Sequence, residues 1–218
     1  MTKLDKHIRR YTTIAATIDI LQRQQLPLLN PERWDDQNDR HFMKLYKKAK
    51  GIGGLYALCA ASSSETYHHW RVFTSAADGV CIEIRRQDFE NELEKKLQGV
   101  RFGEMEYLKI SDIKTLSAKD VSRLPFIKRV GFSAESEYRI IAETDQAQAS
   151  AYPVAFPLSL ISRIYFNPWL PATIAESLTR TIRELKGCRG IRVVRSHLID
   201  SETWKRSGDC IAGEPLLE

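Results

Sequence analysis

The sequence predicts an α+β fold: a single domain with a central mixed or antiparallel sheet flanked by helices. Helical and strand-like patterns alternate irregularly along the 218 residues. No glycine-rich loop follows a strand, as one would in a nucleotide-binding parallel sheet, and the glycines at residues 51–54 lack the spacing of either phosphate-binding fingerprint. No repeat, low-complexity tract or linker divides the chain, so residues 1–218 are predicted to form one domain.

The predicted helices follow from apolar side chains at helical spacing and from residues that start or stop a helix. Residues 14–25 show this period, and Thr12 or Thr13 can cap them. Pro171 suits the first position of a later helix, whereas Pro125 breaks or restarts another. The predicted helices are 14–25, 40–50, 87–97, 119–130 and 172–186, with a short helix running through Trp70.

The predicted strands are short runs rich in β-branched and aromatic residues. Pro27 confines the run 26–29 to a sheet edge or to the start of a strand. A turn signal at 78–79 precedes the run 80–84, and residues 144–150, rich in Gln and Ala, form a loop between two strands. The other predicted strands are 55–61, 100–108, 137–142, 161–166 and 191–194.

Composition argues against several classes of protein. No apolar run approaches the roughly 18 residues of a membrane-spanning helix, and the charged amino terminus does not open a signal peptide. We therefore expect a cytoplasmic protein without membrane contact. Cys59 and Cys81 lie in apolar runs and are expected in the core, while Cys188 and Cys210 lack Cys-x-x-Cys spacing and a histidine placed to complete a zinc site. Neither a metal site nor a disulfide framework is predicted.

Basic residues are in moderate excess. The chain has 33 basic and 28 acidic residues, a formal net charge of +5 and a pI near 9.0. This excess permits a polyanionic partner such as nucleic acid without establishing one. Two groups of basic residues are either solvated helix faces or binding surfaces. They are Lys44, Lys47, Lys48 and Lys50, and Arg180, Arg183, Lys186, Arg189, Arg192 and Arg195.

Two segments near helix starts contain more polar residues than helix capping requires. An acidic segment beginning at Trp34 places three aspartates and an asparagine before a helix, and capping explains one or two of the acids. After the strand that ends near residue 61, Ser62 with Glu65 matches a capping box, although serines there also suit a small polar ligand. The adjacent His68 and His69 point in different directions on a helix, so they cannot pair on a metal.

A third segment alternates charged and apolar side chains. Glu135, Glu137 and Arg139 would share one face of a strand, with Tyr138 and Ile140 packing on the other. The charged face is either exposed to solvent or lines a cleft. In a cleft, Arg139 would hold one carboxylate ionised while burial raises the pKa of the other.

Taken in order, these segments resemble a prokaryotic family, domain of unknown function 2971 (DUF2971). The resemblance covers about residues 8–200. It rests on Leu-Leu-Asn-Pro at 28–31 with the acidic helix start up to Asp39, Trp70, Asp-Gly-Val-Cys-Ile-Glu-Ile at 78–84, Phe89, Lys128, and Glu-Ser-Glu-Tyr-Arg-Ile at 135–140.

The order of parts in this family is similar to that of ADP-ribosyltransferases, which implies NAD as a substrate. Glu137 would then be the catalytic glutamate, with Glu135 beside it. Arg10 or Tyr11 on the first strand would anchor NAD, and Tyr11 is also a catalytic candidate. The resemblance implies further NAD-binding residues: Ser62 and Ser64 for the nicotinamide ribose, Tyr67 or Trp70 for stacking, Lys128 and Arg139 for a phosphate or for Glu137, and Thr12, Asn30 and Trp34.

The acceptor implied by this activity is nucleic acid (RNA or DNA) or protein, as for a toxin or phage-defence effector with a cognate antitoxin. Two other functions stay open. A metal-dependent nuclease would use Asp78, Glu83 and Arg85 at a strand end. A non-catalytic module would bind a polyanion through the basic helix 172–186, with steep salt dependence.

Overall fold

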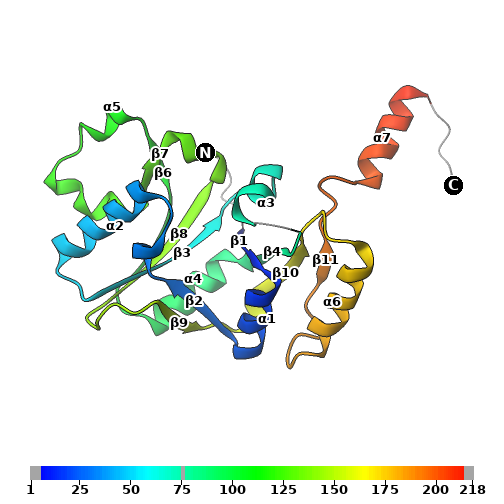
Figure 1. Cartoon of the computed structure of the whole chain (residues 1–218), viewed down its shortest axis with the longest axis horizontal. Coiled ribbons are helices and arrows are strands. Elements are labelled where there is room, and N and C mark those ends of the chain that lie inside the picture. The colour runs from blue at the N-terminus through cyan, green and yellow to red at the C-terminus, as the bar shows by residue number, and fades with distance from the viewer. Residues whose placement is uncertain (1–5, 75–76, 214–218) are drawn as a thin grey trace.

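A branched β-sheet forms the centre of the computed structural model, which describes residues 6–74 and 77–213. Helices flank this sheet (Figure 1), so the predicted α+β fold is confirmed. The sheet is mixed, because β10 and β11 run parallel while the other pairs in it are antiparallel. Its strands are β1 (His7–Thr13), β2 (Gln25–Leu29), β3 (Gly54–Ala61), β4 (Gly79–Arg85), β5 (Val100–Glu104), β8 (Glu137–Thr144), β9 (Ala151–Ala155), β10 (Ile161–Phe166) and β11 (Val193–Arg195).

The sheet branches at β3. The main path runs β11-β10-β4-β1-β3-β2-β9, and β8 joins β3 to β5. β3 pairs with β8 along its whole length, but with β1 only where Arg9 lies opposite Ala61 and with β2 only where Leu29 lies opposite Ala57. β1 and β3 therefore separate beyond Arg9. The backbone N–H and C=O groups that face this gap cannot form hydrogen bonds between the two strands, so they need other partners.

Capping residues set the limits of the first two helices. Thr13 accepts a hydrogen bond from the Ala16 backbone N–H at 3.2 Å, as predicted for the first helix. Asp36 accepts bonds from the backbone N–H groups of Asn38 and Asp39 at the start of the second. The helices are α1 (Ile14–Arg23), α2 (Gln37–Lys50), α3 (Tyr67–Phe73), α4 (Arg86–Lys96), α5 (Ile110–Ile113), α6 (Ala172–Glu184) and α7 (Glu202–Ala212), with 3-10 turns η1 (Pro31–Arg33), η2 (Ala118–Phe126), η3 (Val130–Glu135) and η4 (Leu158–Leu160).

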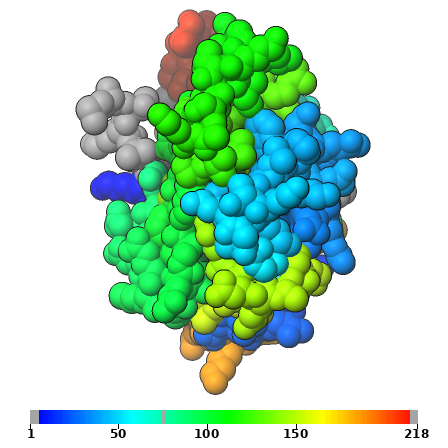
Figure 2. Space-filling view, turned by 90° about the vertical axis from the view of Figure 1, so that its left-hand side faces the viewer, coloured from blue at the N-terminus to red at the C-terminus, as the bar shows by residue number. Residues whose placement is uncertain are grey.

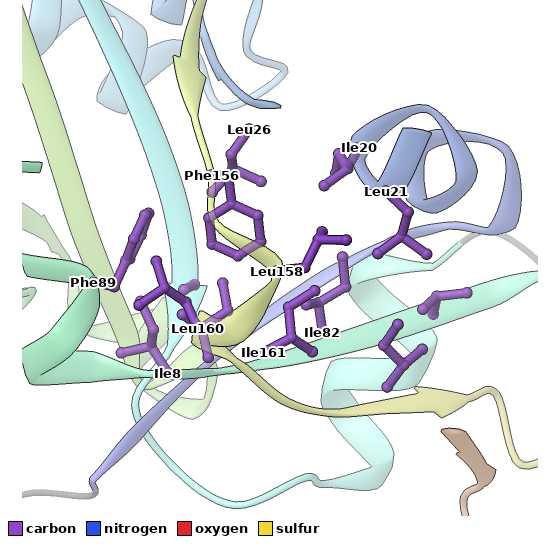
Figure 3. Packing of buried hydrophobic residues seen from close by; sticks show 14 of the residues in the cluster. Ile8, Ile20, Leu21, Leu26, Ile82, Phe89, Phe156, Leu158, Leu160 and Ile161 are labelled. Atoms are coloured by element: carbon purple, nitrogen blue, oxygen red, sulfur yellow. The ribbon is translucent and has the colours of Figure 1, made fainter. Parts of the chain in front are cut away.

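The main apolar core lies on one face of the sheet, under α1, α4 and α6. Figure 3 shows Ile20 and Leu21 of α1 on one side of this core and Phe89 of α4 on the other, with Leu158 and Leu160 between them. Each fully buried side chain of this kind contributes roughly 1.5–3 kcal/mol. The opposite face carries two smaller clusters, one under α2 and one around the buried Trp70 of α3. The gap between β1 and β3 opens beside these smaller clusters.

β2 does not lie at the sheet edge and Pro27 is its third residue, so neither position predicted from Pro27, an edge or a strand start, is found. A strand that was not predicted, β9, covers its outer side, and Pro27 lies opposite Pro153 of that strand. A proline nitrogen cannot donate to a ladder. Because the two prolines lie opposite each other, both missing N–H donors fall at the same position of the β2–β9 ladder. On its other side β2 pairs with β3 only at Leu29, so Pro27 is not required to donate there either.

Two predicted elements are divided in the structure. Residues 100–108 form β5 and then β6 (Glu106–Leu108), which belong to different sheets. The predicted helix 119–130 is η2 followed by strand β7 (Ile127–Arg129), which pairs with β6. Pro125 lacks the N–H that a regular α-helix needs there. Residues 145–150 form the predicted loop, whereas Thr144 still belongs to β8.

The last described element, α7, was not predicted and stands away from the rest of the chain (Figure 1). It has no buried residue, and Trp204 on it is 82% exposed. Among the described residues, every helix is too short or too polar to span a bilayer.

Candidate active site

A cavity of about 640 Å³ opens where β1 and β3 separate. Residues of β1, β3 and α3 line it, together with the segment that leads from η1 into α2. Side chains of the 128–137 region complete the lining. Its charged and aromatic side chains are the cations Arg9, Arg10, Arg33, Arg71 and Lys128, the acids Asp35, Asp36, Asp39, Glu135 and Glu137, and the rings of Tyr11, Trp34 and Phe73.

Arg10 bridges the two separated strands. Its Nη1 donates a hydrogen bond of 2.9 Å to the backbone carbonyl of Cys59, which has no ladder partner in β1. Burial lowers the pKa of Arg10, opposed by the nearby Cys59 and Glu137, yet a guanidinium stays protonated in proteins. Arg10 therefore places a fixed positive charge in the cavity, on the strand where the resemblance placed an NAD anchor.

Glu137 begins β8 and lies in an ion-pair network. Arg139 Nε donates to Glu137 Oε1 at 2.7 Å, and Lys128 Nζ lies 3.1 Å from Glu137 Oε2. Arg139 also binds Asp39 with two short bonds of 2.7 and 2.6 Å and donates to the Pro125 carbonyl at 2.8 Å. Bidentate charge-assisted pairs of this kind define geometry closely. Arg139 has no exposed surface, so it acts from behind Glu137 and does not line the cavity.

These contacts hold Glu137 ionised. Burial by itself would raise the pKa of Glu137, but the charges of Arg139 and Lys128 outweigh it and lower the pKa to about 2. Burial raises the pKa of Asp39 and of Glu135 despite their cationic neighbours. Each carboxylate oxygen accepts more than one bond, so Glu137 keeps acceptor capacity for a ligand.

The lowered pKa of Glu137 predicts a pH-dependent contribution to stability. A carboxyl group with a pKa of about 2 when folded and an ordinary value of 4.5 adds stability above pH 4.5, and this contribution fades as the pH falls towards 2. The Glu137→Gln variant should therefore unfold more easily than the unchanged protein at pH 7, and the difference should shrink below about pH 4.5. Urea unfolding at pH 3–7 measures it; a difference constant over that range would contradict the assignment.

Glu135 reaches the network by a route that the sequence prediction did not contain. It ends the 3-10 turn η3 and is not part of the strand, so the expected alternation of three charged residues on one strand face is wrong. Ser136, with a φ of 44°, turns the chain between Glu135 and Glu137. Lys128 Nζ then lies 2.6 Å from Glu135 Oε2, and His69 Nε2 lies 3.0 Å from the Glu135 carbonyl.

Several residues that the resemblance placed at the NAD site do not line the cavity. Trp70 is 1% exposed and packs in a core cluster, where its Nε1 donates to Glu65 at 2.9 Å. Ser62 donates to the Ser136 carbonyl, and Thr66, not Ser62, caps α3. Three further residues also lie outside it: Asn30 caps η1, Ser64 is exposed, and Tyr67 is 56% exposed.

Tyr11, Thr12 and Trp34 do line the cavity. The Tyr11 hydroxyl lies 3.4 Å from His69 Nδ1, and burial raises the pKa of this phenol. Because His69 Nε2 must donate to a carbonyl, neutral His69 has Nδ1 as its acceptor, and the Tyr11 hydroxyl is the donor. Trp34 lies 4.8 Å from the guanidinium carbon of Arg139, measured to the centre of its ring. Tyr11 and Trp34 are therefore fixed walls of the cavity.

Comparisons with known proteins give structural similarity alone. No model of a known protein family matches the sequence, and no curated protein matches it, so membership of the DUF2971 family stays a prediction. Solved structures of Thermus sp. 2.9 DarT share 11% identity with this chain. The complex with NAD+ covers 90% of this chain and 98% of DarT with a TM-score of 0.45, and the complex with ADP-ribosylated ssDNA covers the same shares with 0.47. The complex with carba-NAD+ covers 88% and 95% with 0.43.

Sequence reasoning missed several residues of the cavity. Asp39 was read as part of a capping segment, but its side chain holds Arg139. Cys59 was expected in the core, yet it lines the cavity beside Glu137. Arg71 and Phe73, at the end of α3, also line it, and no pattern in the sequence marks them. The alternation of β3 could have identified Cys59, since Cys59 lies opposite Arg139 in the ladder.

Proposed function

We propose that this chain is an NAD-dependent ADP-ribosyltransferase. The observation that carries the proposal is Glu137, an ionised carboxylate held by two cations in a cavity that four arginines also line. A fixed negative charge of this kind stabilises a positively charged ribose in the transition state, and it does so without reorganising.

The transfer would break the bond between C1 of the nicotinamide ribose and the nicotinamide nitrogen. The bonding electrons leave with the nicotinamide, and the ribose becomes oxocarbenium-like. Glu137 stabilises this charge, while Lys128 and Arg139 position Glu137. An oxygen or nitrogen of the acceptor then bonds to C1 and loses its proton.

Three arginines of the cavity suit the diphosphate of NAD. Arg10 lies in the gap between β1 and β3, and Arg33 and Arg71 line the same cavity. Arginine is well suited to phosphate because its donors form a planar fork. The rings of Tyr11 and Phe73, 5.8 Å apart between centroids, supply an aromatic surface for a planar base.

Labelled NAD tests the proposed function directly. The purified protein is incubated with NAD labelled in the adenylate, alone and with RNA, DNA or lysate protein, and both nicotinamide release and transfer of label are measured. We expect nicotinamide release and label on one acceptor class. If the folded protein releases no nicotinamide and labels no acceptor, the proposal fails.

Replacing Arg10 with glutamine should weaken NAD binding by roughly tenfold to a hundredfold, because a charge-assisted hydrogen bond contributes about 1.5–3 kcal/mol. Titration calorimetry with NAD measures the change. Arg206→Gln on the exposed helix α7 is the matched control, since this residue lies outside the cavity. If the two variants bind NAD with equal affinity, Arg10 does not contribute to NAD binding.

The nuclease alternative has little support in the structure. Glu83 is buried and forms an ion pair of 2.9 Å with Arg9, and Arg85 pairs with Asp88 at the far end of β4 from Asp78. Within residues 6–74 and 77–213, no three His, Cys, Asp or Glu side chains are grouped so as to hold a metal ion.

A further inference from the structure

A second, smaller pocket adjoins the active-site cavity. It has a volume of about 220 Å³ and is formed by α2, β6, α5 and β7. Figure 2 shows α2 (light blue) beside the green segment that contains α5 and η2. Asp36, Asp39 and Lys128 line both cavities, so these side chains form the wall between them.

The lining of this second pocket is mainly apolar and aromatic. The rings of His41 and Phe42 lie 6.4 Å apart between centroids, and Leu108 and Ile127 are among the aliphatic residues that line the pocket with them. Ile110 lies at the pocket with 60% of its surface exposed. An apolar pocket with a few polar groups is typical of a site for a small planar ligand.

The polar groups of the pocket are available to a ligand. The Asn38 amide and the Arg129 guanidinium make no side-chain hydrogen bond or ion pair to any residue in the described ranges, and Lys109 adds a second positive charge. By contrast, Lys128 and Asp39 of the shared wall already form ion pairs: Lys128 with Glu135, and Asp39 with Arg139. Among the charges of the lining that lie outside this network, the cations Lys109 and Arg129 outnumber the acid Asp36, whose carboxylate caps α2, and this excess favours an anionic ligand.

We propose that this pocket binds one unpaired nucleobase of a single-stranded nucleic-acid acceptor, with the adjoining phosphate held by Lys109 and Arg129. The proposal rests on the proposed function, because the adjoining cavity supplies the ADP-ribose. Phe42 offers a ring on which any base stacks. The Asn38 amide offers both a donor and an acceptor to a base edge. A base can enter such a pocket only when it is unpaired.

The nucleotide whose base lies in this pocket is a neighbour of the one that is modified. Asp39 and Lys128 stand between the pocket and Glu137, so an atom held in the pocket cannot approach the reacting ribose. The pocket therefore selects the sequence that flanks the modified position. Flanking contacts are a common source of sequence preference in enzymes that act on bases.

Fluorescence anisotropy without NAD tests the pocket. The probes are fluorescein-labelled 12-residue DNA and RNA of random sequence, single-stranded, and the same DNA as a duplex, all at fixed salt. We expect single strands to bind better than the duplex, and Phe42→Ala and Arg129→Glu to weaken that binding by about tenfold. The controls Leu45→Ala and Lys95→Glu make comparable changes at exposed positions of α2 and α4 outside the pocket, and should stay within about twofold of the unchanged protein.

Three results would overturn the pocket proposal: no binding of single strands, equal losses in the pocket variants and their controls, or transfer of label to protein alone. Asn38→Ala, at an exposed position, provides a second variant if Phe42→Ala does not fold, and it should reduce preference among probes that differ in one base. If only the pocket variants lose affinity for single strands but the protein never cleaves NAD, the proposed transferase function would be wrong, while the pocket would still be a nucleic-acid-binding site.

Discussion

Glu137→Gln should reduce NAD cleavage by about 10²- to 10³-fold, the loss seen when one preorganised electrostatic contact to a transition state is removed. Glutamine keeps the size and one acceptor oxygen of Glu137, but it cannot carry the negative charge that Arg139 and Lys128 maintain. The affinity for NAD should change far less than the rate, because the charge matters most once the ribose becomes positive.

Single-turnover nicotinamide release at pH 7 measures this loss, with circular dichroism to confirm folding. Glu94→Gln, at an exposed position of α4, is the matched control and should retain full activity. Glu137→Asp keeps the charge but withdraws it from both cations and from the cavity, so its activity should lie between the two. A Glu137→Gln protein that is folded and fully active would show that the reaction does not depend on this carboxylate.

Arg139→Met should destabilise the fold by about 3–5 kcal/mol, the cost of leaving a buried charge without its partner. Arg139 is the only group that binds Asp39, Glu137 and the Pro125 carbonyl together among the described residues. Its removal leaves two buried carboxylates facing an apolar side chain. Total stabilities of single domains are about 5–15 kcal/mol, so this loss is a large fraction of the whole.

Chemical unfolding at pH 7 measures the loss, with Arg123→Met as the control. Arg123 also pairs with two acids, Glu106 and Asp120, but on an exposed surface where ion pairs contribute little. The double variant Arg139→Met with Asp39→Asn should recover part of the stability, because one uncompensated charge is gone. Equal losses for Arg123→Met and Arg139→Met would contradict a buried network.

The sequence predicted the parts of this site that depend on local periodicity. Glu137 and Arg139 are two residues apart in a strand, so they share a face, and their 2.7 Å contact follows from the strand period. The same period predicts that Tyr138 and Ile140 face the main core, as they do. Glu135 shows where periodicity stops, because Ser136 adopts a left-handed conformation that non-glycine residues rarely take.

Residues at the cavity that depend on capping or long-range packing were predicted less well. Trp70 lies on a predicted short helix, but the helix rotates it into the core and presents Arg71 and Phe73 to the cavity. Ser62 and Ser64 follow the expected strand, yet Thr66 takes the capping role, and the serines lie outside the cavity. In this seven-residue helix Tyr67, Trp70 and Phe73 are three residues apart, yet of these only Trp70 is fully buried, because two turns are too short for apolar spacing to fix the buried face.

The cavity therefore combines side chains of β1, β3, α3 and the start of α2 with those of residues 128–137. By itself the sequence determined the α+β class, most strands and helices, and the two faces of β8, because these depend on neighbours a few residues away. The tertiary structure alone decided that Asp39 meets Arg139 across 100 residues of chain, and that β1 leaves β3 beyond Arg9 to open a cavity beside Arg10. Contacts between distant segments depend on strand register and on the packing of whole helices, which no local pattern encodes.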